Sequence, residues 1–165
     1  MTEWYWRTHN DGKGLLIREF PAVKGGKGRA EGKRHIDGVI ICGKKSGNRK
    51  GRKGDRAKVK GKKVIVIQSK AKRLGMYLIG QTIVSRELMK ILGAKVVLSV
   101  AVHRKDDPVM LKVLKRFKKC QAVVYPGAKS CNLGQHVVLS LPCVHRAAAS
   151  ASQHASRSPH DLRSW

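Results

Sequence analysis

Three polar residues lie near the ends of two apolar stretches and have the side-chain types that phosphodiester chemistry needs. Asp37 lies in HIDGVII, near the entry of an apolar run, and the run VIVIQSKA ends in Gln68 and Lys70. Side chains alternate along a strand, so Gln68 and Lys70 share a face with Val64 and Val66. If the two stretches pair as a hairpin with Asp37 opposite the end of the second, the carboxylate, the amide and the ammonium converge.

That set of groups predicts a site for a hard cation and a phosphate. A carboxylate and a second oxygen ligand, here Asp37 and Gln68, can hold Mg²⁺, which keeps several waters and bridges to phosphate. Lys70 would stabilise an attacking hydroxide or the charge that builds on phosphorus. The structural alternative is that Asp37 pairs with Arg18 or Lys33, and that Gln68 and Lys70 are the polar end of a strand.

The surrounding pattern predicts the elements that position these residues. Apolar runs and turn residues indicate a short N-terminal helix, three strands, a helix, a strand, a helix with Asp107 as its N-cap, and a last strand. The stripe of Tyr77, Val84, Leu88 and Ile91 supports the first long helix. The expected fold is α/β, with a mixed sheet flanked by helices. The expected ranges are 2–10, 15–23, 35–42, 63–69, 76–92, 95–102, 107–119 and 121–125.

The placement of these motifs resembles the PD-(D/E)xK, or restriction-endonuclease-like, nuclease superfamily. Asp37 in IDGVI, followed by Gln68-Ser69-Lys70 at the end of the next strand, is similar to the branch in which glutamine replaces the acid before x-Lys. The resemblance covers residues 1–125 in element order and a few residues in sequence. It implies a nuclease-like core with strand-strand-strand-helix-strand-helix-strand order after the short first helix.

The resemblance also implies roles for individual residues. Asp37 and Gln68 would ligate Mg²⁺ or Mn²⁺, and Lys70 would be the catalytic lysine. The family commonly takes a further acid from its first helix, for which Glu3 is the candidate by position and Glu19 the alternative. Gln81 is similar to an auxiliary polar residue of some members. Gln68 departs from the acidic form and brings no charge to the metal.

Charge is concentrated in a basic segment, residues 24–73. The chain has 36 Lys and Arg against 10 Asp and Glu, a formal net charge of +26. The basic segment holds 19 of these cations and 3 acids, a net charge of +16. It consists of two Gly-rich basic loops, 24–34 and 43–62, around the strands that carry the candidate site, and a solvated loop is its structural alternative. The residues expected to contact phosphates are Lys24, Lys27, Arg29, Lys33, Arg34, Lys44, Lys45, Arg49, Lys50, Arg52, Lys53, Lys72 and Arg73.

These patterns predict a nucleic-acid-binding protein that hydrolyses phosphodiesters with a metal ion. DNA is favoured over RNA as partner, and a membrane is not expected because the charges lie in loops. The alternatives are a basic binding protein without catalysis, such as an inactive nuclease fold, and a ribosome-associated protein. The chain reads as cytoplasmic, and a dimer is compatible with it. The expected organisation is a core at 1–126, an extension at 127–146 and a disordered tail at 147–165.

Overall fold

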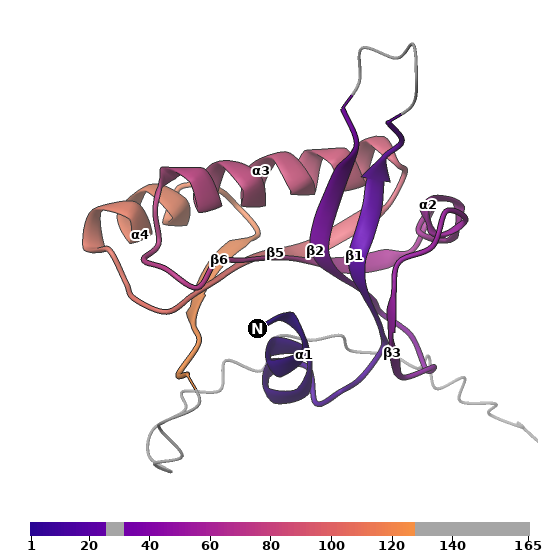
Figure 1. Ribbon diagram of the computed structural model, residues 1–165, viewed down its shortest axis with the longest axis horizontal. Helices are drawn as coiled ribbons and strands as arrows, with labels where there is room; N and C mark the ends of the chain where they lie inside the picture. Colours follow the sequence, from indigo (N-terminus) through magenta and orange to yellow (C-terminus); the bar gives the residue numbers. More distant parts are fainter. Residues whose placement is uncertain (26–31, 128–165) are drawn as a thin grey trace, which may run out of the picture.

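A computed structural model of the protein describes residues 1–25 and 32–127, which form an α/β fold around one mixed six-stranded sheet (Figure 1). The strand order is β3-β1-β2-β4-β5-β6. β2 is antiparallel to both β1 and β4, whereas the pairs β1–β3, β4–β5 and β5–β6 are parallel. The mixed sheet flanked by helices is therefore confirmed.

The observed elements follow the expected order with two additions, β3 and α2. The helices are α1 (Thr2–His9), α2 (Asp55–Lys58), α3 (Met76–Ile91) and α4 (Pro108–Lys115). The strands are β1 (Leu15–Val23), β2 (Arg34–Ile41), β3 (Gly47–Lys50), β4 (Lys63–Ser69), β5 (Lys95–His103) and β6 (Cys120–Val124). β2 and β4 pair as the expected antiparallel hairpin. The expected N-cap of α4 is confirmed, since the Asp107 carboxylate accepts from the backbone N–H groups of Val109 and Met110.

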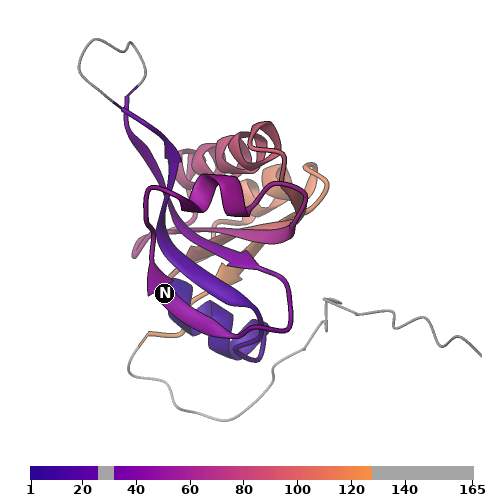
Figure 2. The same cartoon turned by 90° about the vertical axis from the view of Figure 1, so that its right-hand side faces the viewer.

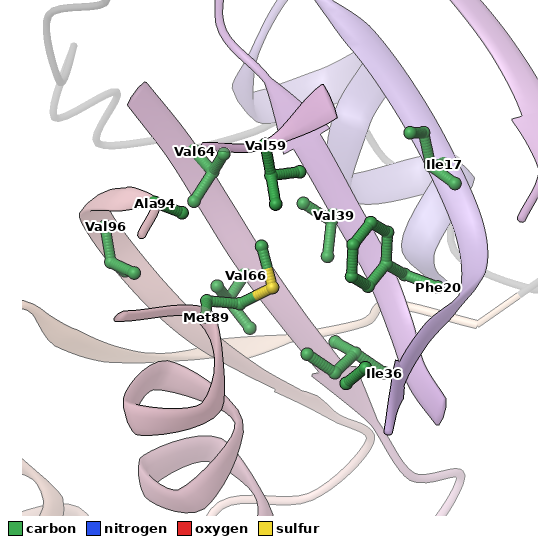
Figure 3. Packing of buried hydrophobic residues seen from close by; sticks show 11 residues of the cluster. Ile17, Phe20, Ile36, Val39, Val59, Val64, Val66, Met89, Ala94 and Val96 are labelled. Atoms are coloured by element: carbon green, nitrogen blue, oxygen red, sulfur yellow. The ribbon is translucent and has the colours of Figure 1, made fainter. Parts of the chain in front are cut away.

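The helices cover both faces of the sheet. α3 and α4 lie on one face and α1 lies on the other, so β4 in the middle is buried from both sides (Figures 1 and 2). A continuous apolar strand such as KVIVIQS suits that position. Met89 of α3 packs on the sheet through the largest cluster of buried residues (Figure 3), which consists of Ile17, Phe20, Ala22, Ile36, Val39, Val59, Val64, Val66, Met89, Ala94 and Val96.

Side-chain alternation is broken at one point in β1 and β2. Ile17 and Phe20 lie in the same cluster although they are three residues apart, and so do Ile36 and Val39 on the neighbouring strand. An odd spacing places two residues on opposite faces of a regular strand. In β1, the residue within this interval that departs from strand geometry is Glu19, whose φ is +50°.

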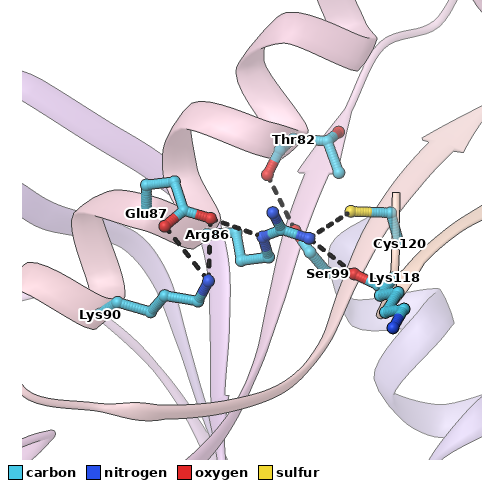
Figure 4. A network of polar contacts seen from close by, with 7 residues as sticks. All are labelled: Thr82, Arg86, Glu87, Lys90, Ser99, Lys118 and Cys120. Atoms are coloured by element: carbon cyan, nitrogen blue, oxygen red, sulfur yellow. Dashed lines mark hydrogen bonds and ion pairs between the residues drawn. The ribbon is translucent and has the colours of Figure 1, made fainter. Parts of the chain in front are cut away.

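α3 is seated on the sheet through the apolar side chains of Leu78, Ile79 and Met89 and also through small polar residues. Thr82 and Ser85 are buried, and Ser99 of β5 donates from its hydroxyl to the Thr82 carbonyl at 2.9 Å. Arg86 donates to the Lys118 carbonyl at 2.6 Å, which ties α3 to the start of β6 (Figure 4). The apolar stripe expected on this helix faces solvent instead, with exposed fractions of 71% for Tyr77, 53% for Val84 and 80% for Ile91.

The segment 43–62 is more ordered than a solvated basic loop, because it contains β3 and α2. The fully buried Asp55 carboxylate accepts two hydrogen bonds from Arg49, at 2.6 and 2.7 Å, and one from the backbone N–H of Arg52 at 2.8 Å. These contacts hold the pKa of Asp55 well below its usual value, at about 2, with the Arg49 hydrogen bonds as the main cause. They fix β3 against the edge of β1.

The expected extension and tail, from residue 128 onward, lie outside the described residues, as do Lys27 and Arg29.

Candidate functional site

Asp37 lies where β2 and β4 separate. The regular β2–β4 ladder ends at the pair Gly38 and Ile67. Beyond it, the Oδ2 atom of Asp37 accepts from the backbone N–H of Ser69 at 2.8 Å and from the Ser69 hydroxyl at 3.0 Å. The carboxylate thus replaces a strand carbonyl at the end of β4. This arrangement explains why an acid is tolerated beside an apolar strand.

A second acid lies across the β1–β2 ladder from Asp37. Arg18 pairs with Gly38 and Phe20 with Ile36, which places Glu19 opposite Asp37 in the register. Two like charges at opposite positions destabilise a sheet unless something compensates them. Lys50 of β3 does so for Glu19, with its Nζ atom 3.0 Å from Oε2, and this contact lowers the pKa of Glu19.

These side chains line one pocket, which we call the acidic pocket. Its lining residues come from the N-terminal end of α1, from β1, β2 and β3, and from the end of β4, and they are Thr2, Arg18, Glu19, Asp37, Lys50 and Ser69. The pocket therefore brings two carboxylates, a hydroxyl, an ammonium and a guanidinium together. The positive φ of Glu19 lies at its rim, and backbone strain of that kind clusters at functional sites.

The structure does not bring Gln68 and Lys70 into this pocket. Gln68 is 2% exposed, points towards α3 and donates from Nε2 to the Ser85 hydroxyl at 2.6 Å. Lys70 lies over the ring of Tyr77, also on α3, with its Nζ atom 5.4 Å from the ring centroid. Gln68 and Asp37 line two pockets that share no residue. The convergence expected from a regular hairpin is absent, because the alternation breaks beside Asp37.

The remaining sequence candidates are also placed by the structure. Glu3 on α1 is 2.6 Å from Arg7 in a surface ion pair and does not line the acidic pocket. Gln81 lines the pocket of Gln68 and donates to the Tyr77 hydroxyl at 3.3 Å. Of the acids proposed from the sequence, Glu19 is the one that lies beside Asp37.

The structure separates the basic residues into paired and unpaired groups. Arg49 is held by Asp55, Lys50 by Glu19, and Arg73 lies 3.9 Å from Asp107. A larger group in the described part of the basic segment has no carboxylate within 4.0 Å: Lys24, Lys33, Arg34, Lys44, Lys45, Arg52, Lys53, Arg56, Lys60, Lys62, Lys63, Lys70 and Lys72.

The acids show the opposite pattern. Among the acidic residues in 1–25 and 32–127, Asp37 alone has no basic side chain within 4.0 Å. The sequence alternative in which it pairs with Arg18 or Lys33 is therefore not observed. Asp37, the one carboxylate in the described part of the chain without a basic partner, is held by backbone and hydroxyl donors instead.

Within the described ranges, no group of three or more His, Cys, Asp or Glu side chains is arranged to hold a metal ion. The acidic pocket offers two carboxylates and a hydroxyl. That donor set suits Mg²⁺, which is usually bound by one or two carboxylates with waters and phosphate oxygens as its other ligands. Lys50 competes with a metal ion for Glu19, so Asp37 is the stronger candidate ligand.

Sequence reasoning missed the contributions of Lys50 and Ser69 to the pocket. Lys50 was predicted only as a phosphate contact, because β3 is too short and polar to be recognised as a strand. Ser69 lies within the QSK motif itself, between the two residues that were chosen. Because side-chain alternation breaks beside Asp37, Ser69 contacts the Asp37 carboxylate and Gln68 and Lys70 do not. No sequence signal marks that break.

Comparisons with protein-family models, with curated proteins and with solved structures found no match. In the described part of the chain, no helix has both the length and the apolar character needed to cross a membrane.

Proposed function

We propose that this protein binds nucleic acid through the sugar–phosphate backbone, on an α/β core that resembles the restriction-endonuclease-like nucleases. The observation that carries the proposal is the group of cations in the basic segment that have no carboxylate within 4.0 Å. A protein with so large a charge excess opposes its own compaction, and a polyanion relieves that repulsion while it releases counterions. DNA is favoured over RNA by the nuclease resemblance.

Two sets of lysines provide a matched test of this binding. Lys44, Lys45 and Lys53 are exposed and unpaired in the basic segment, and Lys112, Lys115 and Lys118 are exposed on and after α4. Each triple replacement by Gln removes the same net charge. We expect the first set to weaken duplex DNA binding by at least tenfold at low salt, and the second to weaken it by much less. Equal losses would show that net charge alone attracts DNA.

Phosphodiester hydrolysis is the second candidate function, and the composition of the acidic pocket favours it. Asp37 and Glu19 would hold Mg²⁺ or Mn²⁺, which supplies charge neutralisation at a phosphate and a more acidic bound water. Ser69 orients the Asp37 carboxylate through two hydrogen bonds. Lys50 and Arg18 line the same pocket and would stabilise negative charge on the phosphate oxygens.

A pair of lysine variants distinguishes this pocket from the site that the QSK motif indicates. Plasmid cleavage would be measured with Mg²⁺ and Mn²⁺ for the wild type, Asp37→Asn, Lys50→Met and Lys70→Met. If the acidic pocket is the catalytic site, Asp37→Asn and Lys50→Met abolish cleavage and Lys70→Met retains it. Loss with Lys70→Met but not with Lys50→Met would instead support the motif. Metal-independent binding with no cleavage by the wild type would contradict hydrolysis and leave the binding proposal intact.

A further inference from the structure

A groove runs along α3, and the apolar stripe that faces solvent forms one of its walls. Two adjoining pockets make up this groove, and they share Arg34 and Leu88. Tyr77 and Val84 line one pocket, and Ile91 lines the other. The opposite side comes from the ends of β1 and β2 (Figure 1) and from α2. We call it the α3 groove.

The larger pocket of the α3 groove is lined by two glutamines whose Oε1 atoms have no hydrogen-bond donor among the described residues. Gln68, although only 2% exposed, donates from Nε2 to Ser85 and leaves its Oε1 atom without a partner in the described residues. The Oε1 atom of Gln81 is likewise buried and without a donor. A buried acceptor left unsatisfied costs on the order of 1–3 kcal/mol. Two of them beside one pocket indicate a ligand that supplies N–H donors.

The smaller pocket has a buried hydrogen-bond donor in its lining where the larger pocket has buried acceptors. The Nε atom of Arg56 is buried without an acceptor in the described residues, and Arg34 lies between the two pockets. The α3 groove therefore offers acceptors at one end, cationic donors at the other, and an apolar wall along its length. Its larger pocket has a volume of about 430 Å³, which is in the range of ligand sites.

This combination excludes a metal ion as the ligand and fits a nucleotide. The described residues that line the groove include no carboxylate, and Arg34 would repel a cation. A nucleobase presents N–H donors on its edge, an apolar face for stacking and an attached phosphate. In duplex DNA those edges and faces are occupied by pairing and stacking. An unpaired base is therefore the form that can enter.

We propose that the α3 groove binds unpaired bases of a nucleic-acid strand, with Gln68 and Gln81 accepting from a base edge, Tyr77 stacking on the base, and Arg34 and Arg56 contacting the adjacent phosphate. This inference rests on the proposed nucleic-acid binding and names the class of substrate. The two amide oxygens are buried, so an entering base has to displace side chains of the lining, among them Tyr77, whose hydroxyl accepts from Gln81 at 3.3 Å. Tyr77 is 71% exposed, and its ring can then stack on the base.

The test measures fluorescence anisotropy at fixed salt, with EDTA present to prevent cleavage. The probes are a single-stranded DNA, the same sequence as RNA, the matched DNA duplex, and a strand of equal length made of abasic sites. The abasic strand keeps the phosphates and lacks the bases. We expect the wild type to bind single-stranded DNA or RNA about tenfold more tightly than the abasic strand, a factor typical of one stacked base.

Variants on one helix assign that difference to the groove. Tyr77→Ala and Gln81→Leu should each remove most of the tenfold preference and leave duplex affinity within about twofold. Tyr77→Phe keeps the ring and should keep the preference. Met76→Ala, at an 80% exposed position outside the groove lining, should behave as the wild type. If the wild type binds the abasic and natural strands equally, the groove does not read bases. If it binds none of the probes, the proposed function itself fails.

Discussion

Replacement of Asp55 by Asn would test whether one buried ion pair fixes β3 and so holds Lys50 beside Glu19. The Asp55 carboxylate is fully buried, while the Arg49 side chain is 24% exposed and donates to it twice, at 2.6 and 2.7 Å. These contacts lower the pKa of Asp55 from 3.8 to about 2. Since one pKa unit corresponds to about 1.4 kcal/mol, the charged form contributes about 2 to 3 kcal/mol to folding. Asp55→Asn should lose about that amount at pH 7.

The pH dependence gives the sign of the effect. The folded pKa lies below the unfolded value, so the contribution is complete above about pH 4 and is lost as the pH falls through about 2. Urea unfolding followed by tryptophan fluorescence would measure both proteins between pH 7 and pH 3. The difference in unfolding free energy should be largest at pH 7 and should shrink at the acidic end.

Asp11→Asn is the matched control, because Asp11 pairs with Lys13 at 3.1 Å but its side chain is 73% exposed. Exposed pairs contribute about 0–1 kcal/mol, so this variant should change stability little at any pH. If Asp55→Asn costs no more than Asp11→Asn, or if its cost is independent of pH, the buried pair does not hold β3.

Three further outcomes follow from the fold. Burial raises the pKa of Tyr5 to about 12, so its contribution to stability is complete below pH 10 and is lost as the pH rises towards 12. In urea unfolding measured across that pH range, the unfolding free energy of Tyr5→Phe should therefore fall less with rising pH than that of the wild type. Gly14→Ala should cost about 1–3 kcal/mol in the same assay, because its φ is +75° and the new Cβ would lie 2.7 Å from the Ile41 carbonyl oxygen. Gly54→Ala, with φ −78° and open space around the new Cβ, should be neutral or slightly stabilising. Equal effects of the two variants would contradict the assigned backbone conformations. Ser69→Ala should lower metal-dependent cleavage without changing DNA affinity, since it removes one of the two donors that orient Asp37, and unchanged cleavage would argue against that role.

Much of the fold could be predicted from the sequence because its long elements have strong local signals. The apolar run LLIREFPAV predicted the bounds of β1, and Asp107-Pro108 predicted the start of α4. β3 and α2 were missed because their sequences, GNRK and DRAK, are short and polar. They form through tertiary contacts, namely pairing with β1 and the buried Asp55, which no local pattern reveals.

The candidate site could be predicted only in part. An acid beside an apolar strand singled out Asp37 as a candidate, and Glu19 was one of the two acids considered as its companion. The partners on β4 could not be chosen from the sequence, because a regular strand would place Gln68 beside Asp37. Side-chain alternation breaks where Glu19 has a positive φ, so Ser69 and not Gln68 contacts the Asp37 carboxylate. Likewise, the apolar stripe on α3 predicted the correct helix, although its buried face consists of other residues, namely Leu78, Ile79, Thr82, Ser85 and Met89.

The salt dependence of nucleic-acid affinity tests the central claim most directly. Binding of a DNA duplex would be measured in EDTA from 50 to 200 mM salt, for the wild type and for the variant with Lys44, Lys45 and Lys53 replaced by Gln. With about six phosphate contacts, wild-type affinity should fall on the order of a thousandfold over this range, and the slope of log K against log salt should be less steep by about 3 in the variant. Absence of binding at 50 mM, or an affinity that does not change with salt, would contradict the claim that the basic segment binds the phosphate backbone.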